Sequence, residues 1–223
     1  MEQKNIIEAV ENRYTGLAEV ECCLSCGGAA QKAGITKGEV CVDFGSGRGT
    51  DVIRMATETG AEGFVYGIDA TRAMIEKASV LAEKLGVKNA TFIEAELDKL
   101  PLAAAIVDCV VSNCTINHAS DKKAVWREIY RVLKPGGRFV VSDIYASTPV
   151  PMEYAKDPQA IAECWAGSQT RQDYLDTVLD VGFSGVHILE ESEPYEKGRI
   201  QVSSFTIAGE KPAGCSCSSG CCS

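Results

Sequence analysis

The chain of 223 residues has only two histidines, few aromatic residues and no excess of positive charge. Its net charge is −9 and its pI about 4.9, so the basic surface that binds nucleic acid or an anionic membrane is missing. No apolar run approaches the length of a transmembrane helix, and the N-terminal MEQKNIIEAVENRY lacks the apolar stretch of a signal peptide. We therefore expect a soluble, cytoplasmic protein with neither a nucleic-acid nor a membrane partner.

Cysteine, by contrast, is abundant, with 11 residues. Without an export signal these thiols are expected to stay reduced, so a disulfide framework is not predicted. One cluster comprises Cys22, Cys23 and Cys26, a second comprises Cys215, Cys217, Cys221 and Cys222, and Cys41, Cys109, Cys114 and Cys164 lie between them. Because a buried core does not need such clusters, some of the thiols are predicted to bind a ligand.

Apolar strand patterns alternate with amphipathic helix patterns along most of the chain. Strands are predicted at 38–44, 63–69, 89–97, 105–113, 137–145, 183–192 and 199–210, and helices at 5–14, 50–59, 70–86, 121–134, 158–167 and 170–182. This alternation predicts an α/β fold with a doubly wound, mostly parallel, seven-stranded sheet closed by an antiparallel strand. We expect three parts: an N-terminal helix with a Cys-rich lid (1–37), the main domain (38–210) and a Cys-rich tail (211–223).

A glycine-rich turn, GSGRG, follows the first predicted strand and precedes a helix. In open α/β sheets a nucleotide binds at such a turn, so Gly45, Gly47 and Gly49 predict a nucleotide site, with a purely structural turn as the alternative. The dinucleotide fingerprint would need glycine where Thr50 stands. Asp69 ends the second strand and could accept hydrogen bonds from a ribose, or it could simply start a helix. The ribose role would suit NAD and S-adenosylmethionine equally.

Four ordered motifs carry a family resemblance. VDFGSGRGTD, GIDATRAMIEKA, FIEAELDKLPL and RVLKPGGRFVVSD together resemble class I S-adenosylmethionine-dependent methyltransferases over residues 38–145. The resemblance implies that the glycine turn bends around the methionine part of the cofactor, that Asp69 binds the ribose and that Met74 lies along the adenine. The cofactor-binding residues that it implies are Asp43, Gly45, Ser46, Gly47, Gly49, Asp69, Ala70, Met74, Glu96, Leu97 and Asn113.

Two further motifs, SNCTIN and AECWAG, are similar to those of the arsenite methyltransferases. By this resemblance Cys114 and Cys164 hold trivalent arsenic, and Cys22, Cys23 or Cys26 supplies a third sulfur. Arsenic(III) is a soft centre, and soft centres select thiolates. The arsenic atom itself would then be the nucleophile, which suits a chain with two histidines because no general base is needed. A thiol reductant such as glutathione or thioredoxin is expected, and a monomer is favoured.

Other interpretations of these residues remain open. Cys114 could be a small apolar residue that ends a strand, since buried cysteine packs well. Cys41 and Cys109 are predicted to belong to the core. His118, where the family more often has leucine, could line the pocket, but a solvent-facing position on a loop is expected. The tail could bind metal or be incidental. The alternative functions are methylation of a small organic acceptor and non-catalytic metal or metalloid binding on the same scaffold.

Overall fold

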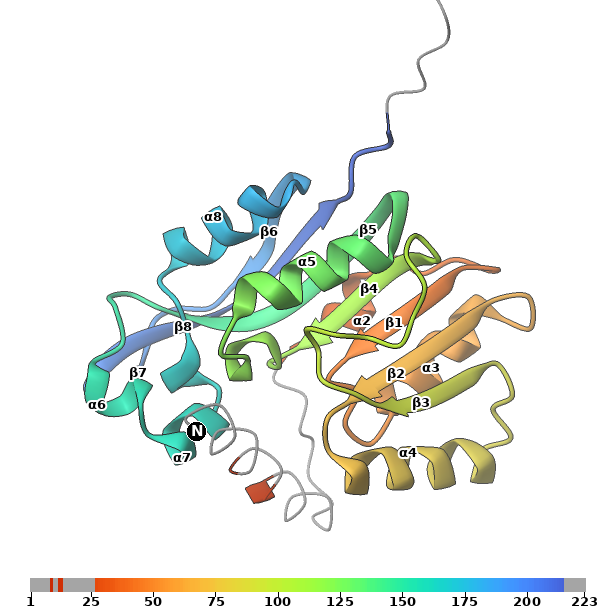
Figure 1. The fold of residues 1–223 in the computed structure, drawn as a ribbon, viewed down its shortest axis with the longest axis horizontal. Coiled ribbons are helices and arrows are strands. Elements are labelled where there is room, and N and C mark those ends of the chain that lie inside the picture. Colours follow the sequence, from red (N-terminus) through yellow and green to blue (C-terminus); the bar gives the residue numbers. More distant parts are fainter. Residues whose placement is uncertain (1–8, 10–11, 14–26, 215–223) are drawn as a thin grey trace, which may run out of the picture.

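The computed structural model describes residues 9, 12, 13 and 27–214 (Figure 1). Its central feature is one sheet with the strand order β3-β2-β1-β4-β5-β8-β6, and β7 pairs with β8 at its side. The strands are β1 (Val40–Phe44), β2 (Phe64–Asp69), β3 (Ala90–Glu94), β4 (Val107–Asn113), β5 (Leu133–Ala146), β6 (Ser184–Glu191), β7 (Tyr195–Lys197) and β8 (Ile200–Glu210). All pairings from β3 to β5 are parallel, and β8 runs antiparallel to both β5 and β6. The predicted α/β fold with an antiparallel closing strand is confirmed.

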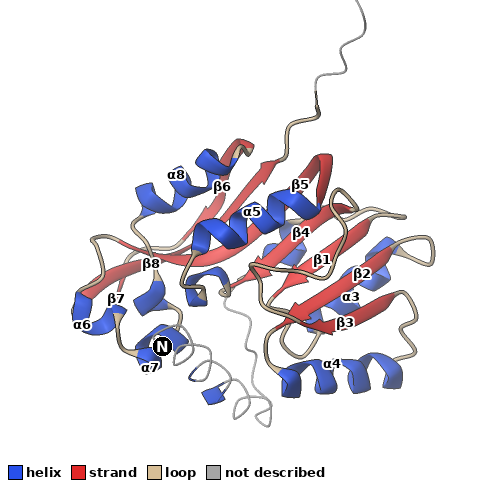
Figure 2. Cartoon of the chain, viewed as in Figure 1, coloured by secondary structure: helices blue, strands red, loops and turns tan. Residues whose placement is uncertain are grey.

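Helices cover both faces of this sheet (Figure 2). They are α2 (Ala29–Lys32), α3 (Thr50–Thr59), α4 (Arg72–Lys84), α5 (Lys122–Val132), α6 (Met152–Ala155), α7 (Pro158–Ala162) and α8 (Arg171–Val181). Short 3-10 turns span Ile116–His118 and Trp165–Gly167. Helices α5 and α8 pack together over the larger apolar core, whereas α2 and α3 cover the opposite face. The central strands β1 and β4 are thus buried on both sides, which is why they are almost continuously apolar in sequence.

The cysteines within the sheet belong to the core, as predicted. Cys41 on β1 and Cys109 on β4 are register partners on neighbouring strands, and both are fully buried. Their surroundings are the apolar side chains beneath α2 and α3. The sheet therefore uses these two thiols as small apolar groups, away from the carboxyl ends of the strands.

The structure departs from the predicted elements near one cysteine. The helix predicted over 158–167 is interrupted: α7 ends at Ala162, and Cys164 has a φ of +72° before the next turn begins. A residue in the left-handed region cannot continue a right-handed helix. The short α6 and β7 were not predicted, since neither has enough residues to show a period. The predicted N-terminal helix and the Cys-rich tail lie almost wholly outside the described residues.

The strand order reverses direction between β1 and β4. From β1 the chain proceeds outward through β2 to β3, and it then returns to β4 on the other side of β1. Crevices at the carboxyl ends of strands flanking such a switch point are the usual ligand sites of open α/β sheets. Phe44 at the end of β1 pairs with Ile68 on one side and with Ser112 on the other. Among the predicted site residues, Gly45 follows β1, Asp69 ends β2 and Cys114 follows β4.

Candidate active site

The glycine turn after β1 is fixed to the end of β2. The amides of Gly45 and Ser46 both donate to the Ile68 carbonyl at 2.8 Å, and the Gly47 amide donates to Asp69 Oδ2 at 2.9 Å. Gly45 has a φ of +77°, and a side chain there would overlap Thr115 on the loop after β4. The turn therefore requires glycine both for its left-handed backbone and for the close approach of a neighbouring loop.

Asp69 links this turn to the helix that follows it. Besides the Gly47 contact, its Oδ1 accepts the Thr71 amide at 2.8 Å. Each carboxylate oxygen keeps a second lone pair for another donor. The helix-start role and the ribose role are thus compatible in this geometry, and the ribose contact stays a prediction.

Three carboxylates gather around the turn. Burial raises the pKa of Asp43 well above its usual range, and the negative charges of Asp51 and Asp69 raise it further. Burial also raises the pKa of Asp51, and it raises that of Asp69 despite the backbone hydrogen bonds to that carboxylate. Carboxylates that repel one another in this way favour a cation between them.

The residues of this pocket fit S-adenosylmethionine, which carries a sulfonium and an ammonium group. The acidic cluster suits those charges, and the buried Ser46 hydroxyl has no hydrogen-bond partner among the described residues. Asn113 donates to Asp51 Oδ2 at 2.9 Å, which joins the end of β4 to the start of α3 beside the glycine turn. Met74 is fully buried on α4, Ala70 and Leu97 are partly buried, and Glu96 is exposed. The cofactor contacts predicted for Met74, Ala70, Glu96 and Leu97 stay predictions.

Cys114 and Cys164 meet at the end of β4. Cys114 follows β4 directly, and the Cys164 thiol donates to the Cys114 carbonyl at 2.9 Å. Both side chains are buried in a small apolar cluster with Ile144, Trp165 and their neighbours. Of the three described non-glycine residues with positive φ, two are these cysteines, at +52° and +72°. Such backbone strain gathers at functional sites, so the geometry speaks against a role for Cys114 as mere packing.

The structure corrects the prediction that His118 faces solvent. The residue lies partly buried, with Nε2 3.0 Å from Cys164 Sγ. Burial alone would lower the pKa of His118, but the negative charge of Cys164, their hydrogen bond and the charge of Asp143 together raise it. The 3-10 turn at Ile116–His118 brings the ring inward, a conformation too short to show in the sequence pattern.

A buried polar network behind His118 was not predicted. Asp143 on β5 is 1% exposed and accepts hydrogen bonds from Asn117 Nδ2 at 2.7 Å and from the Tyr174 hydroxyl at 3.4 Å. Burial and the charge of Cys164 raise the pKa of Asp143 to about 7, despite the opposing positive charges of His118 and Lys122. An acidic residue inside the apolar strand FVVSDIY was the signal that could have revealed this network.

Arg13 and Gly27, two described residues that precede α2, each lie close to a residue next to one of the two thiols in sequence. Arg13 Nη1 lies 3.6 Å from Glu163 Oε1, next to Cys164. Gly27 lies so close to Ser142 and Asn113 that a side chain at position 27 would overlap both. Cys22, Cys23 and Cys26 fall between Arg13 and Gly27 in sequence, and they lie outside the described residues. Within the described part, no group of three His, Cys, Asp or Glu side chains could hold a metal ion.

Comparison with known proteins identifies the fold and the family. A methyltransferase domain model matches residues 35–183. The chain is 36% identical over 200 residues to an arsenite methyltransferase of Halobacterium salinarum, covering 85% of this chain and 51% of that protein. It is 34% identical over 189 residues to the arsenite methyltransferase of Mus musculus, covering 81% and 47%. The chain thus spans about half the length of these curated relatives.

A solved structure indicates the same family. The arsenic(III) S-adenosylmethionine methyltransferase of Chlamydomonas reinhardtii superposes with a TM-score of 0.75 and 30% identity, covering 92% of this chain and 74% of that one. The chain therefore belongs to the S-adenosylmethionine-dependent methyltransferases of the class I fold. Within them it belongs to the family of the arsenite methyltransferases. In the described residues no helix has the length and apolar character needed to cross a membrane.

Asp69→Ala should weaken S-adenosylmethionine binding by roughly 1.5–3 kcal/mol, the usual contribution of hydrogen bonds to a charged acceptor. It also frees the Gly47 amide and so loosens the turn. Calorimetric titration would measure the change. The matched control is Glu94→Ala, because Glu94 is the exposed register partner of Asp69 on β3. Unaltered affinity with a lowered melting temperature would limit Asp69 to a structural role.

Asp143→Asn should change how stability depends on pH. Because the folded pKa of Asp143 is raised to about 7, the folded protein binds more protons than the unfolded chain between the ordinary aspartate pKa and 7. Stability therefore falls as pH rises through that window, by up to roughly 1.4 kcal/mol per pH unit. The variant should lose this slope while keeping the acceptor for Asn117. Urea unfolding from pH 5 to 8 would measure it, and parallel curves would contradict the assignment.

Proposed function

We propose that the protein transfers a methyl group from S-adenosylmethionine to trivalent arsenic held by cysteine sulfurs. The observation that carries this proposal is a pair of buried cysteines whose backbones both have positive φ angles. The Cys164 thiol donates a hydrogen bond to the Cys114 carbonyl at 2.9 Å. Asn113, whose amide donates to Asp51, directly precedes Cys114. The family membership supports the same reaction.

The substrate chemistry matches these groups. Arsenic(III) in water carries hydroxyl groups, and each thiol that binds it forms an As–S bond and releases one water. The imidazole Nε2 of His118 is placed to take the Cys164 proton as that bond forms and to pass it to the departing hydroxyl group, which leaves as water. Sulfur ligands on one side leave the arsenic lone pair free on the other, so the protein needs no general base to create a nucleophile.

The cofactor, when bound, supplies an electrophilic methyl group on its sulfonium. The chain's own contribution is to orient the arsenic toward that group and to exclude water. Both thiols lie in an apolar cluster, and well-oriented reactants can recover roughly 7–11 kcal/mol of a reaction barrier. The carboxyl groups of Asp43, Asp51 and Asp69 lie together at the cofactor end of the site, and a cationic cofactor would favour their charged forms.

The third sulfur is assigned to the N-terminal cluster. Its supports are the Arg13–Glu163 ion pair beside Cys164 and the packing of Gly27 against Asn113 and Ser142. A segment attached at both places would bring Cys22, Cys23 or Cys26 over the arsenic as a lid. The tail cysteines are proposed to bind arsenic before transfer. A thiol reductant, glutathione or thioredoxin, returns the site to its reduced state, and the protein is proposed to act as a cytoplasmic monomer.

The direct test is incubation of the reduced protein with arsenite and S-adenosylmethionine labelled in its methyl group. Cys114→Ser and Cys164→Ser should each abolish methylation of arsenite and of methylarsenite, because hydroxyls are poor ligands for a soft centre. Cys109→Ser is the matched control, because it changes the same group inside the core, on the strand that leads to Cys114. It should lower stability and retain activity. Full activity in either site variant would remove that cysteine from the site.

Replacing Cys22, Cys23 and Cys26 together by serine should separate the two substrates. Arsenite offers three positions to sulfur, whereas methylarsenite, which already carries one carbon, offers two. With Cys114 and Cys164 intact, the variant should lose arsenite methylation and keep methylarsenite methylation. Deleting residues 213–223 should mainly lower the apparent affinity for arsenic. If the triple variant methylated both substrates, the third sulfur would have to come from the tail or from a small thiol.

A further inference from the structure

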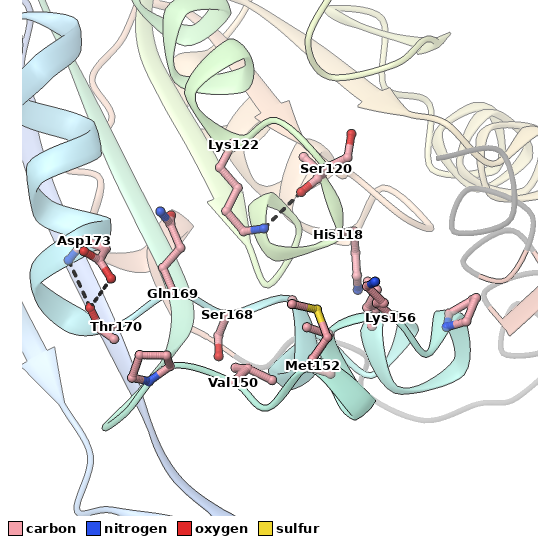
Figure 3. A pocket seen from close by; sticks show the side chains of 17 residues that line it. His118, Ser120, Lys122, Val150, Met152, Lys156, Ser168, Gln169, Thr170 and Asp173 are labelled. Atoms are coloured by element: carbon pink, nitrogen blue, oxygen red, sulfur yellow. Dashed lines mark hydrogen bonds between the residues drawn. The ribbon is translucent and has the colours of Figure 1, made fainter. Parts of the chain in front are cut away.

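A further pocket is lined by His118 but by neither Cys114 nor Cys164, and the methyl transfer makes no use of it. Its volume is about 560 Å³, which is ordinary for a small-molecule site. Figure 3 shows its side chains, which come from the start of α5, from the α6–α7 segment and from the residues that precede α8. Val150, Met152 and Ile161 give it an apolar wall, and Met152 is 66% exposed.

The charge of this pocket is positive, in a protein whose net charge is −9. Lys122 is half-buried, and its Nζ donates to the Ala119 carbonyl at 3.0 Å but forms no ion pair with any described residue. Lys156 lies exposed on the rim and likewise pairs with no carboxylate in the described part of the chain. The one carboxylate of the lining, Asp173, accepts the Thr170 hydroxyl at 2.6 Å. Asp143 and Asp121 act on the Lys122 charge without forming an ion pair with it, so the remaining N–H donors of its ammonium group suit an anionic partner.

The pocket and the thiol site share a wall. His118 lines the pocket, and its Nε2 lies 3.0 Å from Cys164 Sγ. Ala166 and Gly167, which follow Cys164 in the next turn, line the pocket too. A small molecule bound here would therefore be separated from the Cys164 sulfur by a single imidazole ring. This position matters because both cysteines are otherwise buried among apolar side chains.

We propose that this pocket binds a small carboxylate-bearing thiol, with its carboxylate on Lys122 and Lys156 and its sulfur toward His118. This role of the pocket depends on the proposed function, the methylation of arsenic held by Cys114 and Cys164. Once the His118 ring turns aside, the incoming thiol forms an S–As bond and gives up its proton, the Cys164 S–As bond breaks, and the Cys164 sulfur takes up a proton. Nothing is oxidised or reduced in this exchange, which releases arsenic from the protein.

The experiment uses the full, reduced chain without arsenic, and glutathione as the probe. Calorimetry should show binding of glutathione and equal binding of S-methylglutathione, since the carboxylates are recognised before any reaction of the sulfur. Lys122→Gln should raise Kd about 10-fold or more, the loss expected for a charge-assisted hydrogen bond. The matched control is Lys123→Gln: Lys123 neighbours Lys122 on α5, but it pairs with Asp180 at 2.9 Å. It should leave Kd unchanged.

A second readout tests where the sulfur lies. Glutathione disulfide should modify Cys164 faster than the uncharged 2-hydroxyethyl disulfide does, with one glutathione released per mixed disulfide, and Lys122→Gln should remove this preference. Peptide mass mapping would follow the modified cysteine. Glutathione binding that ignores Lys122, or no preference for the charged disulfide at Cys164, would overturn the proposal. Binding that depends on Lys122 in a protein that does not methylate arsenic would uphold this pocket and refute the proposed function.

Discussion

The contact between the Cys164 thiol and the Cys114 carbonyl organises the whole site. It joins the end of β4 to a turn 50 residues further along the chain, and both cysteines take a left-handed backbone to reach it. A left-handed residue other than glycine costs free energy, which the surrounding packing must offset. Here the packing is the apolar cluster that includes Ile144 and Trp165. The α6–α7 segment is thereby fixed over the carboxyl ends of β4 and β5.

Two kinds of environment lie side by side at these strand ends. On one side of Asn113 the carboxylates of Asp43, Asp51 and Asp69 surround the glycine turn and favour a cation. On the other side the thiols are enclosed by apolar side chains, with one imidazole and the Asp143 network behind them. A charged, polar cofactor and a soft, thiophilic substrate need such opposite surroundings. Asn113, through its hydrogen bond to Asp51, forms the boundary between the two.

Local sequence patterns predicted the parts of the structure that depend on local periodicity. The strand–turn–helix at GSGRG and the burial of Cys41 and Cys109 follow from patterns a few residues long. The inward turn of His118 and the helix break at Cys164 depend instead on contacts between segments far apart in sequence. Asp143 illustrates the limit: its partner Tyr174 is 31 residues away, and no local signal pairs them. The cysteine pair was predicted only because its motifs resemble a known family.

The attachment of the glycine turn has a consequence for the entropy of binding. Three backbone amides of the turn, at Gly45, Ser46 and Gly47, are already held by the Ile68 carbonyl and the Asp69 carboxylate. A loop that must order itself around a ligand loses conformational freedom on association, and affinity falls accordingly. This turn has given up that freedom during folding, when the strands β1 and β2 paired. Cofactor affinity therefore draws on the stability of the sheet itself, and a mutation that loosens the β1–β2 pairing would weaken binding without touching the ligand.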